Sequence, residues 1–357
     1  YKGRMDAERN FGYYALYVSY FPQLVAGPIE RADHLLPQLK EEHLPSREDF
    51  RIGLEYMLMG FFRKCVISDI IGIYVNKVFQ DLSVASSFSI LVAGSLFLFQ
   101  IYCDFAGYSE IAMGASRMLG IRLMKNFDSP YLATSVKDLM RRWHISLNLW
   151  FRDYVYIPLG GNRKGKAKRI RNILIVYALC GFWHGANWNY MFWGLYVAIC
   201  LILEDILKKP IKNFARKIGL DLCSPFCLMM RRIFVFLVFL VAGFFFRCQS
   251  LREIGILFTR LFTDVSFSLS YFENSFQNLG LDSLQIIMVI GLLCSLIPIA
   301  KMNESQKTKQ LGFVFGGKER NPKVELLLSM VLFSCIALSW IYLDSIDATS
   351  QFAYFQF

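Results

Sequence analysis

The stretch CGFWHGANW, residues 180–188, joins two apolar runs of the sequence, at residues 173–183 and 190–203. It contains His184, one of only four histidines in the chain. Both runs are apolar enough for helices, so the sequence predicts a helical hairpin with His184 at its turn. The first limb would rise about 16 Å, roughly half of the hydrocarbon thickness of a bilayer. We therefore expect His184 near the middle of a membrane, where an ionisable side chain is a functional candidate; a structural histidine bonded to another helix is the alternative.

Small and polar residues flank this histidine. Gly181 and Gly185 have no Cβ, so they allow a neighbouring backbone or a ligand to approach closely. Asn187 has an amide that can satisfy backbone groups freed at the turn. The turn is therefore expected to be closely packed and polar at its tip.

The composition of the whole chain indicates a membrane protein. Its 357 residues are 55% hydrophobic and 16% aromatic, and their mean hydropathy is +0.38. Four further apolar runs lie at residues 88–103, 233–246, 284–300 and 324–343. Several of the runs are shorter than the roughly 20 residues that cross a bilayer, so tilted, broken or re-entrant helices are expected. We predict an all-α integral membrane protein with the lipid bilayer as its solvent.

The net charge of +11 has an uneven distribution along the chain. Basic residues gather in three predicted loops, at residues 163–171, 208–232 and 301–323, whereas the connections between them are poor in Lys and Arg. This alternation follows the positive-inside rule, and it argues against a nucleic-acid partner. The basic loops are predicted to be cytoplasmic, and the C-terminal residues 352–357 to lie on the outer side.

A second informative stretch covers residues 137–166 and contains His144. On a continuous helix Arg141, His144, Asn148 and Arg152 would share one face, with apolar residues around it. The pattern predicts an amphipathic helix that lines a polar cavity, with Asn148 placed to orient the imidazole of His144. A basic interfacial helix that binds anionic lipid is the alternative.

Polar residues also interrupt the apolar sequence at residues 101–120. Gly107 and Gly114 share a helix face, which is typical of close helix packing in membranes. Charged groups at such a depth need partners, and we predict structural ion pairs rather than catalytic groups, for instance Glu110 with Arg117. Residues 19–31 contain two prolines and are expected to form a kinked or re-entrant segment.

Metal and disulfide chemistry have little support in the sequence. The nine cysteines are scattered, mostly inside apolar runs, and are expected to be buried free thiols. The chain contains neither an HExxH motif nor paired CxxC motifs, so no metal site is predicted.

Four blocks carry a family resemblance: YFPQLVAGPIER, FAGYSEIAMGASRMLGI, RRWHISLNLWFRDYVYIPLGGNRKG and GFWHGANWNYMFWG, in this order. Together they make the chain resemble the membrane-bound O-acyltransferase family, and within it the bacterial alginate O-acetyltransferase branch. The resemblance implies a multi-pass ring of tilted and re-entrant helices around a central acyl-transfer channel, in a bacterial cytoplasmic membrane. It implies one membrane domain over residues 1–357, preceded in family members by further N-terminal transmembrane helices.

The resemblance also implies roles for the two histidines. His184 corresponds to the catalytic histidine of the family, and His144 to its second active-site histidine. Other residues of the matching blocks are expected to bind substrate or support the histidines: Arg141, Asn148, Arg152, Asp153, Trp183, Asn187 and Trp188.

The expected reaction is transfer of an acetyl group from a cytoplasmic thioester, with acetyl-CoA as donor and no permanently bound cofactor. His184 would take the proton of an attacking hydroxyl, while Trp183 and Trp188 exclude water. The basic residues 163–171 could attract the donor's phosphates. The acceptor would be an exported or cell-surface polysaccharide, or an extracytoplasmic relay acetyltransferase of the SGNH esterase type.

Three alternatives remain open at this stage. D-alanyl transfer to teichoic acid is one, although residues 157–163, IPLGGNR, favour acetyl transfer. A lipid or protein acyltransferase of the same superfamily is another. A membrane transporter with a histidine proton relay belongs to a different class; it would usually carry internal repeats, which the sequence does not display.

Overall fold

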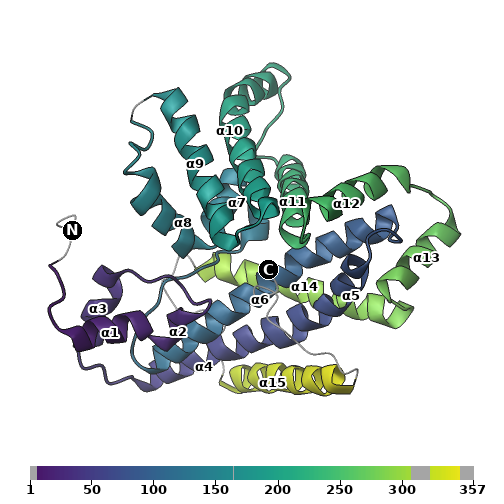
Figure 1. The fold of residues 1–357 in the computed structure, drawn as a ribbon. Helices are drawn as coiled ribbons and strands as arrows, with labels where there is room; N and C mark the ends of the chain where they lie inside the picture. Colours follow the sequence, from purple (N-terminus) through teal and green to yellow (C-terminus); the bar gives the residue numbers. More distant parts are fainter. Residues whose placement is uncertain (1–5, 164, 307–321, 346–357) are drawn as a thin grey trace. The chain divides into compact units, whose positions relative to one another are not determined.

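The computed structural model describes residues 6–163, 165–306 and 322–345, and all regular elements in this part of the chain are helices (Figure 1). The predicted all-α class is therefore confirmed. The described residues divide into two compact units. Unit 1 contains residues up to Ile70, Tyr102–Asp128 and residues from Cys294 onward, and unit 2 contains Ile71–Ile101 and Ser129–Leu293.

Unit 1 begins with short helices and ends with a long one. Its own helices are α1 (Phe11–Ser19), α2 (Phe21–Leu24), α3 (Ala32–Lys40), α4 (Arg47–Phe61), the π-helix η1 (Phe62–Ser68) and α15 (Pro322–Ser345). Three helices contribute to both units: α5 (Asp69–Gln80), α6 (Ser87–Met118) and α14 (Ser283–Gln306).

Unit 2 holds both conspicuous histidines. Its own elements are η2 (Pro130–Leu132), α7 (Val136–Arg142), α8 (Ile145–Phe151), the π-helix η3 (Arg152–Tyr156), α9 (Lys166–His184), α10 (Trp188–Lys217), α11 (Pro225–Arg247), α12 (Leu251–Thr263) and α13 (Leu269–Leu279).

Every apolar run predicted from the sequence lies inside a helix. Among the described residues, four helices are long and apolar enough to cross a membrane, namely α6, α10, α11 and α15. Helix α13 and the first part of α14, to Ile297, are together long and apolar enough for a fifth span, which would be broken or re-entrant because the two helices meet at 72°. Helix α9 is not among them, since its first two turns are rich in Lys and Arg. The lengths and composition of these helices thus agree with the predicted mixture of complete and broken spans.

The basic residues expected in two loops are helical instead. Helix α9 already begins at Lys166, and α10 continues to Lys217. The helices extend beyond their apolar runs because basic residues with long side chains are good helix formers at exposed positions. Lys164, residues 307–321 and the C-terminal residues 352–357 lie outside the described part of the chain.

The core of unit 1 is a close contact between α4 and α6. A Cβ atom built on Gly60 would lie 2.5 Å from the carbonyl oxygen of Gly107, and one built on Gly114 would lie 2.5 Å from that of Gly53. Only glycines allow backbones to approach so closely, so the packing role predicted for Gly107 and Gly114 is confirmed.

The predicted structural pairing of these charges is confirmed, but the example of Glu110 with Arg117 is wrong. Glu110 accepts a hydrogen bond from Arg63 at 2.5 Å, and both side chains are buried. Arg117 pairs instead with Asp49 at 2.7 Å. The partners come from the neighbouring segment Arg47–Ser68, because the glycine contacts bring that segment against α6.

Two smaller expectations concern the N-terminal segment and the thiols. Residues 19–31 are kinked as predicted, since Tyr20 is extended between α1 and the single turn α2, which has Pro22 near its start. All nine cysteines are free, but only five are buried: Cys223 and Cys294 are exposed, and Cys200 and Cys335 are half-buried. No group of three His, Cys, Asp or Glu side chains in the described residues could hold a metal ion.

Helices α9 and α10 of unit 2 lie side by side as an antiparallel hairpin (Figure 1). A Cβ on Gly181 would collide with the carbonyl oxygen of Tyr190, and one on Gly194 with that of Tyr177. A Cβ on Gly185 would lie 2.6 Å from the Tyr190 ring. The glycines of the opening motif therefore make room for α10, not for a ligand.

Candidate active site

His184 is the last residue of α9, and α10 begins after only three further residues. The predicted hairpin with His184 at its turn is confirmed. Its first limb is longer than the apolar run 173–183, because the helix begins at Lys166. The histidine therefore occupies a position fixed by two long, closely packed helices.

Aromatic rings surround the imidazole of His184. Ring centroids lie at 4.9 Å for Trp183, 5.1 Å for Trp193 and 5.2 Å for Phe246, with interplanar angles of 80–84°. Edge-to-face contacts of this kind restrain a ring's orientation as well as excluding water. Trp193 and Phe246 were not predicted from the sequence. Trp193 could have been found from its position early in α10, whereas Phe246 is brought in by α11 and has no local signal.

His144 lies at a break between two short helices, and the continuous helix predicted over this stretch is wrong. Helix α7 ends at Arg142, Trp143 is extended, and His144 has φ +42° and ψ +57° directly before α8. A positive φ is rare for a residue with a side chain, so surrounding contacts must hold it. The break turns His144 inward, and its side chain is buried.

Asn148 supplies these contacts. Its amide nitrogen donates to the carbonyl oxygens of Met140 at 2.8 Å, Trp143 at 2.6 Å and His144 at 3.3 Å. These carbonyls belong to the turn where the helix is interrupted. Asn148 was predicted to orient the imidazole, and the observed bonds act on the backbone that carries it.

The two histidines are brought together around Trp183. The Trp183 ring centroid lies 6.0 Å from that of His144 and 4.9 Å from that of His184. Neither histidine belongs to one of the four helices that could span a membrane. Burial lowers the pKa of His184 to about 3, and burial together with the nearby His184 lowers the pKa of His144 well below its usual value. Both imidazoles are therefore neutral near pH 7, each with one donor and one acceptor nitrogen.

Two asparagine amides tie the hairpin turn to the connection after α11. Asn187 donates to the carbonyl oxygen of Gln249 at 2.9 Å, and Asn189 donates to that of Cys248 at 2.6 Å. Asn189 is fully buried and was missed from the sequence. Because Cys248 follows Phe246 closely, these bonds hold the end of α11 against His184.

The remaining predicted residues lie farther from this cluster of rings. Arg152 donates to the adjacent carboxylate of Asp153 at 2.7 Å, and both belong to η3. Arg141 is exposed, and Trp188 is 63% exposed at the start of α10. Trp183 is thus the member of the predicted tryptophan pair that contacts the histidines.

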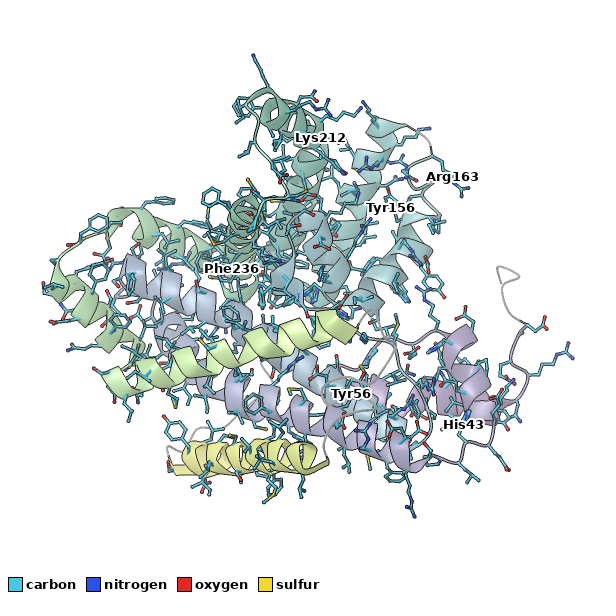
Figure 2. The ribbon with its side chains drawn as sticks, turned by 180° about the vertical axis from the view of Figure 1, so that it is seen from behind. His43, Tyr56, Tyr156, Arg163, Lys212 and Phe236 are labelled. Carbon is cyan, nitrogen blue, oxygen red and sulfur yellow. The ribbon has the colours of Figure 1, made fainter. Side chains whose placement is uncertain are left out.

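A cavity of about 160 Å³ lies between α8 with η3 and α9. Its lining is mainly apolar and consists of Asn148, Phe151, Arg152, Tyr156, Ile173, Val176, Tyr177 and Cys180. Tyr156 marks the η3 side of this cavity in Figure 2. Asn148 is four residues after His144, and Cys180 is four residues before His184, so the cavity borders both elements that carry a histidine.

Basic side chains from α7, α9 and α10 gather near the other end of α9. Asp205 pairs with Arg169 and lies 3.8 Å from Lys137, and Glu204 accepts from the backbone N–H of Val136 at 2.6 Å. Partial burial, followed by repulsion from Arg141, Arg169 and Lys208, lowers the pKa of Lys137. We name Lys137, Arg141, Arg169 and Lys208 the basic cluster.

These features define a helical membrane protein with two neutral histidines in contact with one tryptophan, of which His144 is buried and His184 is half-buried. The chain belongs to the membrane-bound O-acyltransferase family, whose model matches residues 8–245. A probable alginate O-acetylase, AlgI, of Pseudomonas putida is 34% identical over 270 residues, which cover 76% of this chain and 53% of the relative.

Two other relatives differ in their named activity. A peptidoglycan O-acetyltransferase of Helicobacter pylori is 37% identical over 203 residues, covering 56% of this chain and 38% of the relative. A teichoic acid D-alanyltransferase of Streptococcus thermophilus is 30% identical over 237 residues, covering 60% and 55%. All three are named as acyl-transferring enzymes, so the transporter alternative has no support. The chain spans about half the length of the alginate relatives, at 53% of the first.

Proposed function

We propose that the protein is a membrane O-acetyltransferase that moves an acetyl group from a thioester to the hydroxyl of a cell-surface polysaccharide or of a relay partner. The observation that carries the proposal is the neutral pair His144 and His184, held around Trp183. Family membership and the acetyltransferase relatives support the same reaction class.

The reaction assigns a different task to each histidine. The acceptor hydroxyl oxygen attacks the thioester carbonyl carbon, and the unprotonated imidazole nitrogen of His184 accepts the hydroxyl proton. The N–H of His144 donates a hydrogen bond to the carbonyl oxygen, which gains negative charge as the bond forms. The C–S bond then breaks, and His184 returns its proton to the leaving thiolate. The buried rings of Trp193 and Phe246 shield their side of His184 from water, which limits hydrolysis of the thioester.

One face of α9 offers a path for the donor. Arg169, Ile173, Val176, Cys180 and His184 follow one another at helical spacing, over a rise of about 22 Å. The path begins in the basic cluster, passes the cavity and ends at His184. We therefore propose a slender thioester donor with phosphates at its far end, and acetyl-CoA meets this description.

The cavity size favours a short acyl group. At about 160 Å³ it is smaller than the roughly 300–1,000 Å³ of pockets that hold drug-sized ligands. A long fatty acyl chain would need more space beside the histidines. Acetyl transfer is therefore preferred over transfer of a lipid acyl chain.

The basic cluster and the histidine hairpin belong to opposite ends of α9. Under the positive-inside rule the basic end faces the cytoplasm of a bacterial cell, and His184 reaches into the membrane. An acceptor from the outer side would then meet the donor at His184. This polarity suits modification of an exported polysaccharide, directly or through an SGNH-type relay acetyltransferase.

D-alanyl transfer is the second candidate, and the D-alanyltransferase relatives support it. The two candidates differ in their donor, since D-alanyl transfer requires an aminoacyl carrier protein in place of acetyl-CoA. If the purified full-length protein consumes acetyl-CoA when it is supplied with acceptor, acetyl transfer is supported. If it turns over only with the aminoacyl carrier protein, D-alanyl transfer replaces acetyl transfer as the proposed reaction.

The main test is mass spectrometry of cell-surface glycans from cells that express the full-length protein. The variant His184→Ala should lose acetyl esters, because the proton acceptor is absent. The matched control is His34→Gln, which changes a half-exposed histidine in unit 1 and should keep them. Membrane levels of both variants are measured by immunoblot. Equal ester content in wild type and His184→Ala, at equal protein levels, would refute the assignment.

A further inference from the structure

The distal half of α10 extends beyond what a membrane span needs. The helix has 30 residues and a length of about 45 Å, whereas the hydrocarbon core is about 30 Å thick. Its continuous apolar run ends at Leu203, and the remaining residues of the helix, from Glu204 to Lys217, include seven charged side chains. The distal half of α10 therefore lies in a different environment from the apolar half that could span the membrane.

Two opposite faces distinguish this distal half. Leu207, Ile211, Phe214 and Ile218 repeat at helical spacing through the end of the helix and are 46%, 53%, 64% and 56% exposed. Lys209, Lys212 and Arg216 lie on the other side of the helix and are exposed as well. The segment is therefore amphipathic, with an apolar face that the described residues leave largely uncovered.

The charge of the segment indicates what covers it. Residues 206–220 contain five basic and no acidic side chains. Glu204 and Asp205, just before them, are already engaged with α7 and α9. A Lys-rich polar face combined with Leu, Ile and Phe on the other face is typical of helices that lie in an anionic membrane interface.

We propose that residues 206–218 lie in the headgroup region of an anionic leaflet. The apolar face enters the acyl boundary, and Lys209, Lys212 and Arg216 reach the lipid phosphates with their long side chains. Pro210, inside the helix, removes one backbone hydrogen bond and lets the distal half bend toward the interface. Arg163 lies at the same end of unit 2 as Lys212, so the loop before α9 adds positive charge at this level (Figure 2).

The proposal is independent of the acyl-transfer reaction. It requires only that the distal half of α10 responds to lipid charge, and its test does not measure turnover. Each cation near an anionic surface contributes roughly a fivefold gain in binding. Removing three of them should therefore have a large effect.

The experiment is hydrogen exchange of the full-length protein in nanodiscs, followed by mass spectrometry of peptides that cover residues 204–220. One set of discs contains phosphatidylcholine alone, and the other also contains phosphatidylglycerol. Exchange of this segment should be at least roughly fivefold slower in the anionic discs, because bound lipid opposes local opening. Peptides from α15 serve as an internal reference for the general effect of the lipid.

The triple variant Lys209→Gln, Lys212→Gln, Arg216→Gln should lose the difference between the discs. The matched control, Arg9→Gln, Arg47→Gln, Arg252→Gln, removes the same charge from exposed sites elsewhere and should keep it. If the wild-type segment exchanges at the same rate in both kinds of disc, the proposal is overturned, and the apolar face faces water or another protein instead of anionic lipid. The proposal is also overturned if the control variant loses the difference between the discs as completely as the triple variant does. The wild-type comparison decides the matter alone if the triple variant does not fold.

Discussion

At the scale of single residues, the two histidines act through their lack of charge. An imidazole packed against the rings of Trp183, Trp193 and Phe246 is costly to protonate, so one of its nitrogens stays unprotonated at neutral pH. A histidine at the surface would be partly protonated just below neutrality. The aromatic rings thus keep the imidazole available as a base.

This arrangement predicts the pH dependence of acyl transfer. Burial lowers the pKa of His184 and of His144, so both remain neutral as the pH falls through 6.5, the usual histidine value. The acidic limb of the rate profile should therefore have its midpoint clearly below pH 6.5. It is measured by single-turnover transfer in nanodiscs over a pH series, with stability checked at each pH. A midpoint at or above pH 6.5 would contradict a base that its surroundings keep neutral.

Asn148 is the residue on which the position of His144 depends. Its amide donates to three carbonyls around the helix break, so the isosteric change Asn148→Asp removes the donor while it preserves shape. Loss of the donor should cost about 1–3 kcal/mol and release the strained backbone of His144. We expect turnover to fall at least tenfold, with a smaller fall in thermal stability.

Gln38→Glu is the control for this change, because the amide of Gln38 donates to the carbonyls of His34 and Arg122 at the surface of unit 1, outside the unit that holds both histidines. Turnover and melting temperature are compared for both variants in the same detergent. If Asn148→Asp has wild-type turnover, or if both variants lose turnover equally, the specific role of Asn148 is refuted.

At the scale of elements, the sequence predicted helices well and their interruptions poorly. The apolar runs gave α6, α9, α10, α11, α14 and α15 because burial and lipid exposure both require apolar side chains. The break at Trp143 and His144 was missed because it depends on hydrogen bonds from Asn148, which helical periodicity does not encode. Similarly, Phe246 reaches His184 only through the packing of α11 on α10.

The proposed donor path along α9 predicts that filling the cavity blocks acyl transfer. Cys180 lines the cavity one helical turn before His184, so Cys180→Phe should fill it and block the donor. Cys180→Ala should remain active, because neither the proton transfer nor the carbonyl contact uses this thiol. Turnover is measured as a function of donor concentration.

Leu179→Phe is the matched control for added volume, since Leu179 is 45% exposed on α9 and does not line the cavity. We expect it to behave as wild type. Inactivity of Cys180→Ala, or full activity of Cys180→Phe, would remove the cavity from the donor path.

At the scale of the whole molecule, buried charges in unit 1 present a separate problem of stability. Arg63 and Glu110 are only 2% and 8% exposed, and they pair across the glycine contact between neighbouring segments. The sequence predicts that these charges need partners. The partner of Glu110 depends on the packing of two segments that are distant in sequence, so it could not be predicted. Unit 1 therefore depends on this pair in a way that local sequence does not reveal.

Glu110→Ala should destabilise unit 1 more than the loss of an exposed ion pair would, because Arg63 would remain buried without its carboxylate partner. Breaking a buried pair in this way costs roughly 3–5 kcal/mol, whereas replacing both partners by apolar residues is often neutral. The double variant Arg63→Met, Glu110→Leu should therefore recover most of the lost stability. Arg117→Ala, which breaks the more exposed pair with Asp49, should cost only about 1 kcal/mol. The measurement is thermal unfolding of the three purified variants. If the double variant is less stable than Glu110→Ala, the ion pair itself stabilises the fold, and the loss in Glu110→Ala is not due to a buried arginine without its carboxylate.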